Sequence, residues 1–126
     1  MEVSQNFLFL TLSRAFFQKF YFSENFDLRD FANVMSARTA IGHDAQGRMV
    51  LVEVDGKTRQ RGINLFDFAD FLIEHHGLVN AINLDGGGSA SVDRNQTVTN
   101  YPSDFCQEGE EWRCPRRVSS VVRMSN

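Results

Sequence analysis

The residue types best suited to chemistry lie together in one short segment. It reads Asn-Leu-Asp-Gly-Gly-Gly-Ser over residues 83–89. Three successive glycines leave backbone N–H groups unobstructed by side chains, and such groups can hold an anion. Asp85 stands at the end of a predicted strand, where a carboxylate can face a substrate. The alternative is a glycine-rich turn that only reverses the chain.

A second candidate is Arg38, which lies within a short run of small and apolar residues, 37–41. Burying an arginine there requires a partner for its charge. The planar guanidinium suits a phosphate or a carboxylate, which it can bind through two parallel hydrogen bonds. Two interpretations follow from this pattern, a contact with an anionic substrate or a structural pair with an aspartate.

Several other chemistries are disfavoured. The glycine-rich segment lacks the lysine that a phosphate-binding P-loop needs, which argues against a nucleotide-binding domain. His75 and His76 are adjacent on a predicted helix, so they point in different directions and make a poor metal pair. Neither H-x-x-x-H nor C-x-x-C occurs, and we expect no metal site. A serine hydrolase is disfavoured because no G-x-S-x-G elbow is present.

Two strands are predicted upstream of the glycine-rich segment, and a helix follows them. Residues 37–42 read as a short strand and Met49–Val54 as a mostly buried one. Asp55-Gly56 predicts a two-residue hairpin with a return strand over 58–61. Asp44 to Gly47 reads as a plain turn. A helix is predicted over 64–76, with Asn64 as its N-cap, one apolar stripe, and Gly77 as its stop.

The remaining elements are short strands and one long loop. Residues 78–84 form a strand that leads directly into the glycine-rich segment, and two short strands flank Arg94-Asn95. A loop over 100–117 and a last strand over 118–124 complete the chain. The pattern predicts an α+β fold, a mixed β-sheet of short strands with one main packed helix.

Composition indicates one soluble globular domain. The chain has 126 residues and a net charge of −3, which argues against a nucleic-acid partner. No apolar run is long enough to span a membrane. Eight of the 12 phenylalanines lie in the first 31 residues, whereas every glycine lies from Gly42 onward. We therefore separate residues 1–35, a phenylalanine-rich segment, from residues 36–126. The segment is interpreted as an amphipathic helix, with a degenerate targeting signal as the alternative, since no clear signal peptide is present.

Two features favour the secretory pathway. Cys106 and Cys114 lie close together in the predicted loop, where a disulfide would close a small ring. Asn95-Gln96-Thr97 is a glycosylation sequon at a predicted hairpin tip, with Asn95 as the acceptor. Two free thiols in a cytosolic protein are the alternative.

Three segments together resemble the phosphodiester glycosidase family. They read Ser-Ala-Arg-Thr-Ala-Ile-Gly-His-Asp at 36–44, Gln-Arg-Gly-Ile-Asn-Leu at 60–65 and Asn-Leu-Asp-Gly-Gly-Gly-Ser-Ala at 83–90. The tail is more specifically similar to animal members, through residues 101–104, Cys106 and 112–116. The resemblance runs from about Ser36 to Val122, so residues 36–126 are expected to be the C-terminal part of a larger domain of this family.

The resemblance implies an activity, a location and a set of site residues. Animal members act in the Golgi, where they remove N-acetylglucosamine from a phosphodiester on mannose of lysosomal-enzyme glycans and expose mannose 6-phosphate. The implied partners are therefore phosphorylated high-mannose glycans, and no cofactor is needed. The implied catalytic residues are Asp85 and Arg38. The implied substrate-binding residues are Thr39, Asn83, Gly86, Gly87, Gly88, Ser89 and Arg116.

The chemistry gives these residue types a reason. The leaving group is a phosphate, so positive charge around its oxygens matters more than a strong general acid. Arg38 and Arg116 are suited to supply that charge, and the glycine amides add neutral donors. A carboxylate is needed near the anomeric carbon, with Asp85 as first candidate and Asp44 as second. Because the N-terminal part of the family domain is replaced here, an inactive sugar-phosphate-binding or interaction module remains the alternative function.

Overall fold

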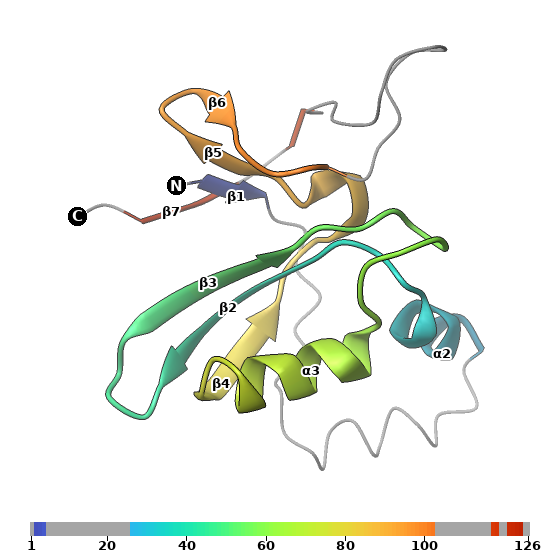
Figure 1. The fold of residues 1–126 in the computed structure, drawn as a ribbon, viewed down its shortest axis with the longest axis horizontal. Coiled ribbons are helices and arrows are strands. Elements are labelled where there is room, and N and C mark those ends of the chain that lie inside the picture. Colours follow the sequence, from blue (N-terminus) through green and yellow to red (C-terminus); the bar gives the residue numbers. More distant parts are fainter. Residues whose placement is uncertain (1, 5–25, 103–116, 119–120, 125–126) are drawn as a thin grey trace.

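The computed structural model describes residues 2–4, 26–102, 117–118 and 121–124 (Figure 1). The helices are α2 (Phe26–Asn33), α3 (Leu65–Glu74) and a single 3₁₀ turn, η1 (Gly87–Ser89). The strands are β1 (Glu2–Ser4), β2 (Arg38–Asp44), β3 (Met49–Val54), β4 (Leu78–Asn83), β5 (Val92–Arg94), β6 (Thr97–Val98) and β7 (Val121–Arg123). This composition of short strands and one main helix confirms the α+β prediction.

A three-stranded antiparallel sheet with the order β3-β2-β4 forms the centre of the fold. Side chains alternate between its two faces, so Ala40 of β2 shares a face with its cross-strand partner Val52 of β3. That face packs against α3 to form the main core. The core residues are Ala40, Val52, Phe68, Leu72, Leu78 and Ala81.

Helix α3 forms where the sequence predicts it. Asn64 is the N-cap, and its Oδ1 accepts a hydrogen bond from the Asp67 backbone N–H at 2.9 Å. The apolar stripe buries Leu65, Phe68, Ala69 and Leu72. The helix ends at Glu74, two residues before the predicted end, and Gly77 follows in a left-handed conformation with φ 63°. A glycine just beyond a helix adopts this conformation without a steric cost.

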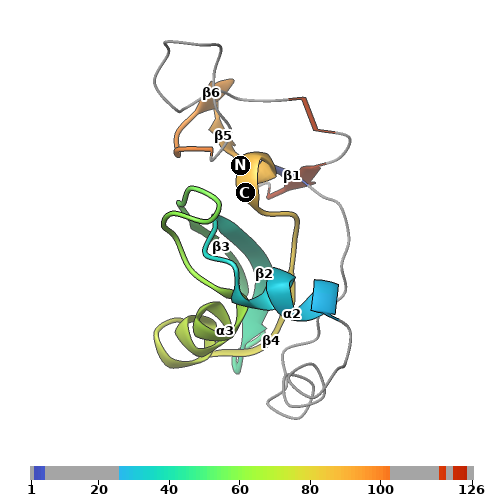
Figure 2. The same cartoon turned by 90° about the vertical axis from the view of Figure 1, so that its right-hand side faces the viewer.

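The second sheet has the order β6-β5-β1-β7, and its pairs are also antiparallel. It lies on the side of the three-stranded sheet that is opposite α3, and both views show this order of layers (Figures 1 and 2). β5 and β6 confirm the two strands predicted around Arg94-Asn95. β7 confirms a last strand, although it covers only part of the predicted range.

The predicted hairpin at Asp55-Gly56 is wrong. β3 pairs instead with the preceding strand, β2, and residues 57–61 form a tight turn with no return strand. The Lys57 N–H donates to the Arg61 carbonyl at 2.9 Å to close that turn. Gly56 is required for a different reason, since a Cβ there would lie 2.4 Å from the Ala37 nitrogen. Close backbone packing explains this glycine, whereas the prediction attributed it to turn geometry.

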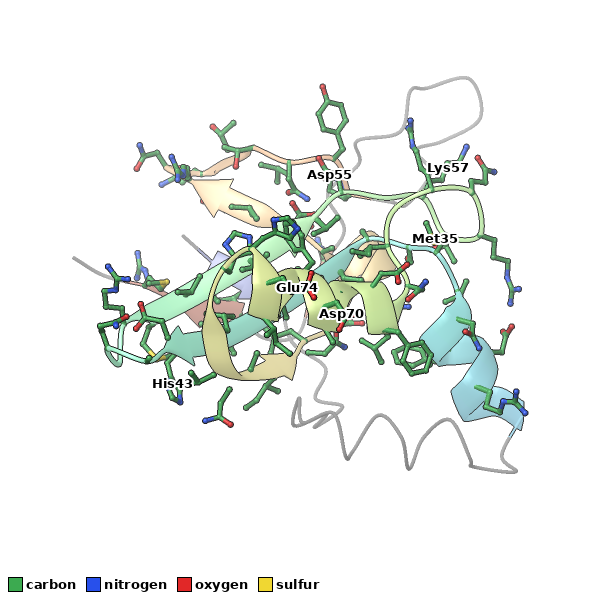
Figure 3. All side chains as sticks on the ribbon, turned by 60° about the horizontal axis from the view of Figure 1, so that its bottom comes forward. Met35, His43, Asp55, Lys57, Asp70 and Glu74 are labelled. Carbon is green, nitrogen blue, oxygen red and sulfur yellow. The ribbon has the colours of Figure 1, made fainter. Side chains whose placement is uncertain are left out.

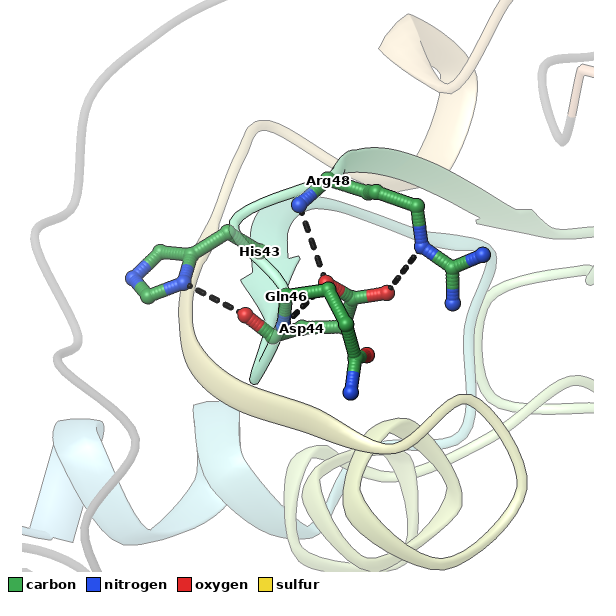
Figure 4. Close-up of polar contacts among 4 residues, drawn as sticks. All are labelled: His43, Asp44, Gln46 and Arg48. Atoms are coloured by element: carbon green, nitrogen blue, oxygen red, sulfur yellow. Dashed lines mark hydrogen bonds and ion pairs between the residues drawn. The ribbon is translucent and has the colours of Figure 1, made fainter.

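The true hairpin turn joins β2 to β3, and Asp44 organises it (Figure 4). Its carboxylate accepts the backbone N–H groups of Gln46 and Arg48, each at 2.9 Å. It also forms an ion pair with the Arg48 side chain at 2.6 Å. These contacts confirm the plain turn at this position. The hydrogen bond from the Arg48 backbone is the main factor that lowers the pKa of Asp44.

Helix α2 lies near the end of the phenylalanine-rich segment and packs against α3. Ala32 of α2 is buried against Leu65 of α3, with Phe31 and Phe66 packed around them. The expected helical character of the opening segment is therefore observed over Phe26–Asn33. Residues 5–25 lie outside the described residues. Among the described residues, no helix has the length and apolar character that a membrane crossing requires.

Candidate functional site

The glycine-rich segment continues from the end of β4 and lies along the start of β2. The Leu84 N–H donates to the Thr39 carbonyl at 2.8 Å, and the Gly87 N–H donates to the Ala37 carbonyl at 2.9 Å. These bonds extend the β2–β4 pairing past the last strand residue. The sheet therefore fixes the backbone from which the predicted site residues project.

Asp85 is held through both its main-chain carbonyl and its carboxylate. The hydroxyl of Thr39, which is completely buried, donates to the Asp85 main-chain carbonyl. The carboxylate Oδ1 accepts the N–H of Gly86 at 3.0 Å. Asp85 is half-buried, and its backbone is fixed by the bond from Thr39. This arrangement suits a carboxylate that must stay in one position during a reaction.

The glycines fix the loop more than the anion-binding hypothesis expects. A Cβ on Gly86 would lie 2.5 Å from the Ala37 carbonyl oxygen, so no side chain fits there. Gly87 has φ 58°, a conformation that favours glycine. The Gly86 amide donates to Asp85 and the Gly87 amide to Ala37, so both are used inside the chain. The Gly86 and Gly87 amides are therefore already used within the chain, whereas the hypothesis requires all three glycine amides to face an anion.

Arg38 makes structural contacts that neither interpretation of the sequence included. Its Nη2 donates to the carbonyls of Phe31 at 3.0 Å and Val34 at 2.9 Å, at the C-terminal end of α2. The guanidinium also lies over the Phe31 ring, 4.9 Å from its centroid. Arg38 is 3% exposed, and this burial lowers its pKa. Arg38 and Thr39 are neighbours on a strand, so their side chains point to opposite faces of the sheet.

The predicted binding residues that flank the glycines are buried. Asn83 is 3% exposed, and its Nδ2 donates to the Leu84 carbonyl at 2.9 Å. Its Oδ1 is buried and has no hydrogen-bond partner among the described residues. Ser89 is 2% exposed and closes η1, where its N–H donates to the Gly86 carbonyl. Direct contact of Asn83 or Ser89 with a substrate therefore remains a prediction.

Sequence reasoning missed a polar cluster beside the glycine-rich segment. Glu53 of β3 is the cross-strand partner of Thr39, and Asp55 follows two residues later, just past the end of β3. Asp55 accepts hydrogen bonds from the Asn100 side chain at 3.3 Å and from the Tyr101 N–H at 2.8 Å. The only signal in the sequence is the alternation of Glu53 and Asp55 at the end of an apolar strand. No neighbouring residue in the sequence indicates that Asn100 contacts Asp55.

The carboxyl group of Glu53 has a raised pKa. Burial first, and then the charge of Asp55, raise its pKa to about 8, and hydrogen bonding from Asn100 opposes this only in part. Its Oε1 is buried without a partner among the described residues. Burial therefore favours the neutral form of the Glu53 carboxyl group.

Several predicted positions lie away from this region. Arg116 and the predicted disulfide partners Cys106 and Cys114 lie outside the described residues. Asn95 is exposed at the β5–β6 turn, where its φ is 53°. Glycosylation of Asn95 remains a prediction. Among the residues that the structure describes, no group of three or more His, Cys, Asp and Glu side chains is placed to hold a metal ion.

A cavity of about 380 Å³ lies at the other end of the central sheet. Ile41, His43, Met49, Asn80 and Ile82 are among the residues that line it. Figure 3 shows His43 and Asp55 at opposite ends of the β2–β3 hairpin. The cavity is thus separate from the glycine-rich segment. Asp44, the second candidate carboxylate, also lies at the cavity end, within the hairpin turn.

Comparison with known proteins identifies the family. The phosphodiester glycosidase family model matches residues 19–122. The chain belongs to the phosphodiester glycosidase family. It is 62% identical over 92 residues to N-acetylglucosamine-1-phosphodiester alpha-N-acetylglucosaminidase of Bos taurus, and 61% identical over 92 residues to the Homo sapiens enzyme. Each alignment covers 73% of this chain.

The structure also matches a solved glycosidase of this family. It superimposes on the zebrafish N-acetylglucosamine-1-phosphodiester alpha-N-acetylglucosaminidase catalytic domain, described as auto-inhibited by pro-peptide, with a TM-score of 0.69 and 50% identity. The match covers 75% of this chain and 30% of the zebrafish chain. The chain spans 17% and 18% of the length of the bovine and human enzymes. The family match begins at residue 19, inside the segment that we separated at residue 35, and the domain boundary remains a prediction.

Proposed function

We propose that this glycosidase removes N-acetylglucosamine from phosphodiesters that link it to mannose on lysosomal-enzyme glycans, in the Golgi. The products are N-acetylglucosamine and an exposed mannose 6-phosphate. The observation that carries the proposal is the half-buried Asp85, whose main-chain carbonyl accepts a hydrogen bond from Thr39 and whose carboxylate accepts one from the Gly86 N–H. Support comes from the 61–62% identity to two enzymes whose names state an N-acetylglucosamine-1-phosphodiester as the substrate.

In the proposed reaction, the bond between the anomeric carbon and the phosphate oxygen breaks, and water supplies the oxygen that replaces it. The phosphate leaves with the bonding electrons as a monoester, so it needs little protonation. Asp85 acts on the developing positive charge of the sugar, as nucleophile, as base for water or as electrostatic partner. Arg116 is proposed to contact the phosphate oxygens. Arg38 is proposed to add positive charge from the start of β2. Its Nη2 stays bound to the carbonyls of Phe31 and Val34 while it does so.

The second candidate function is a sugar-phosphate-binding or interaction module without turnover. The contacts of Arg38 favour it, because a guanidinium occupied by helix carbonyls is less available to a phosphate in the transition state. Such a module would bind the phosphodiester substrate without cleaving it. The two functions therefore differ in turnover and agree in binding.

The test measures release of N-acetylglucosamine from an N-acetylglucosamine-α-phosphomannose substrate by the full chain, and calorimetric binding of the same compound. Asp85→Asn keeps an oxygen that can accept the Gly86 N–H but removes the charge. Asp70→Asn is the matched control, since Asp70 is exposed on α3 (Figure 3). We expect turnover in the wild type and the control, with a loss of at least about 100-fold in Asp85→Asn. Binding without turnover in the folded wild type would establish the second function, and the absence of both would overturn the two proposals.

A further inference from the structure

The exit of the glycine-rich segment is fixed by a side chain, whereas its entry is fixed by backbone contacts. At the entry, the Leu84 and Gly87 N–H groups donate to backbone carbonyls at or just before the start of β2. At the exit, Ala90 is completely buried, and its carbonyl accepts the Asn100 Nδ2 at 2.7 Å. A carbonyl that is buried away from water needs a donor within the protein. Asn100 supplies that donor.

The Asn100 side chain takes the place of a peptide group beside β5. Its Oδ1 accepts the Val92 N–H at 2.7 Å, while its Nδ2 donates to Ala90. The β5–β6 ladder ends just before it, where the Thr99 N–H donates to the Val92 carbonyl at 2.8 Å. A carboxamide carries both a donor and an acceptor, as a peptide group does. Asn100 therefore continues the ladder from β5 back to Ala90, the residue that follows η1.

The same side chain is anchored to the central sheet. Its Nδ2 reaches the Oδ1 of Asp55, just past the end of β3, at 3.3 Å. The Tyr101 N–H donates to the same oxygen at 2.8 Å. β3 pairs with β2, and β2 carries the Thr39 hydroxyl that binds the main chain of Asp85. The entry and the exit of the glycine-rich segment are therefore attached to one sheet, at the start of β2 and at the end of β3.

We propose that Asn100 is a positioning residue that fixes the exit of the glycine-rich segment and so keeps Asp85 and η1 in one arrangement. Asn100 is assigned no contact with substrate. Its hold on η1 stands on contacts within the chain, whereas its effect on turnover rests on the proposed function. Because a misplaced catalytic group loses rate more than affinity, that effect falls on kcat.

The test variant removes one hydrogen bond donor. Asn100→Asp keeps an oxygen that can accept the Val92 N–H but has no donor for the Ala90 carbonyl. Asn80→Asp is the matched control, because the change of side chain is the same. Asn80 is exposed on β4, and its amide contacts His43, at the other end of the central sheet.

Order within η1 is the first property to measure, by NMR on the full chain. Order parameters report motion in picoseconds to nanoseconds at Gly88 and Ser89, and relaxation dispersion reports motion in microseconds to milliseconds. We expect order parameters in the wild type and control of about 0.85, and a fall toward about 0.6 or new dispersion in Asn100→Asp. A role in stability alone would lower the melting temperature without changing either property. Unchanged order on both timescales in folded Asn100→Asp would therefore overturn the proposal.

A second measurement uses the wild type and needs no variant. The side-chain amide protons of Asn100 should give nuclear Overhauser contacts to the Val92 N–H, because Oδ1 binds that group at 2.7 Å. The absence of these contacts would overturn the proposal, even if Asn100→Asp fails to fold.

Kinetics separate this inference from the proposed function. If the full chain has turnover, kcat of Asn100→Asp should fall at least about tenfold, with KM within about threefold of the control. A change in KM alone would overturn the positioning role. Absence of turnover in the wild type would refute only the proposed function, because the two NMR measurements need no substrate.

Discussion

The buried hydroxyl of Thr39 donates a hydrogen bond to the main-chain carbonyl of Asp85, 46 positions later in the chain. This bond joins the start of β2 to the residue that follows β4. It holds the backbone of Asp85 from the side opposite the Gly86 amide. The position of the proposed catalytic carboxylate is therefore decided by a neutral neighbour on another strand.

Removing the Thr39 hydroxyl should weaken both the fold and the site. Thr39→Val keeps the shape but leaves the Asp85 carbonyl without its donor, which costs about 1–3 kcal/mol of unfolding free energy. Thr39→Ser restores the hydroxyl and should recover most of that loss. Denaturant unfolding of the two variants checks the difference. Equal stability of Thr39→Val and the wild type would show that the hydroxyl contributes nothing to the fold.

Replacing Arg38 should loosen α2. Arg38→Met preserves the apolar stem but removes the donors to the carbonyls of Phe31 and Val34, and we expect a loss of at least about 2 kcal/mol. Hydrogen exchange should rise in α2 well before it rises in α3. Arg48→Met is a suitable control, since Arg48 lies in the exposed hairpin turn. A variant that loses turnover at unchanged stability would instead identify Arg38 as a substrate contact.

A methyl group at Gly86 should displace the glycine-rich segment. Gly86→Ala places a Cβ 2.5 Å from the Ala37 carbonyl oxygen, so the backbone must move. Overpacking of this kind costs about 1–3 kcal/mol. Gly47→Asn is the control, because nothing lies within 4 Å of a Cβ there and asparagine tolerates its positive φ. A thermal midpoint equal to that of the control would contradict the close packing at Gly86.

Asp44 should make the fold sensitive to acid. Its pKa is lowered in the folded state, chiefly by the hydrogen bond from the Arg48 backbone. A lowered pKa contributes stability above the ordinary value of 3.8, and this contribution is lost as pH falls through the folded value. Asp44→Asn should therefore be less stable than the wild type at pH 7, with the difference narrowing below about pH 4. Thermal unfolding across that range provides the check, and a constant difference would contradict it.

Local pattern alone determined the elements whose causes lie within a few residues. The N-cap of α3 and its apolar stripe depend on neighbours at helical spacing, and the turn at Asp44 depends on amides two and four positions later. The glycine-rich segment after β4 could be found for the same reason. Its residues form the turn themselves.

Only the tertiary structure decided the features that depend on contacts between residues far apart in the sequence. The guanidinium of Arg38 binds the end of α2 because the packing of Ala32 against Leu65 brings that helix to it. Gly56 is needed because the backbone of Ala37 passes within 2.4 Å of where its Cβ would be. Asp55 meets Asn100 across 45 positions. Sequence spacing carries no information on such meetings, because burial and backbone approach are set when the sheet, the helices and the loops pack together.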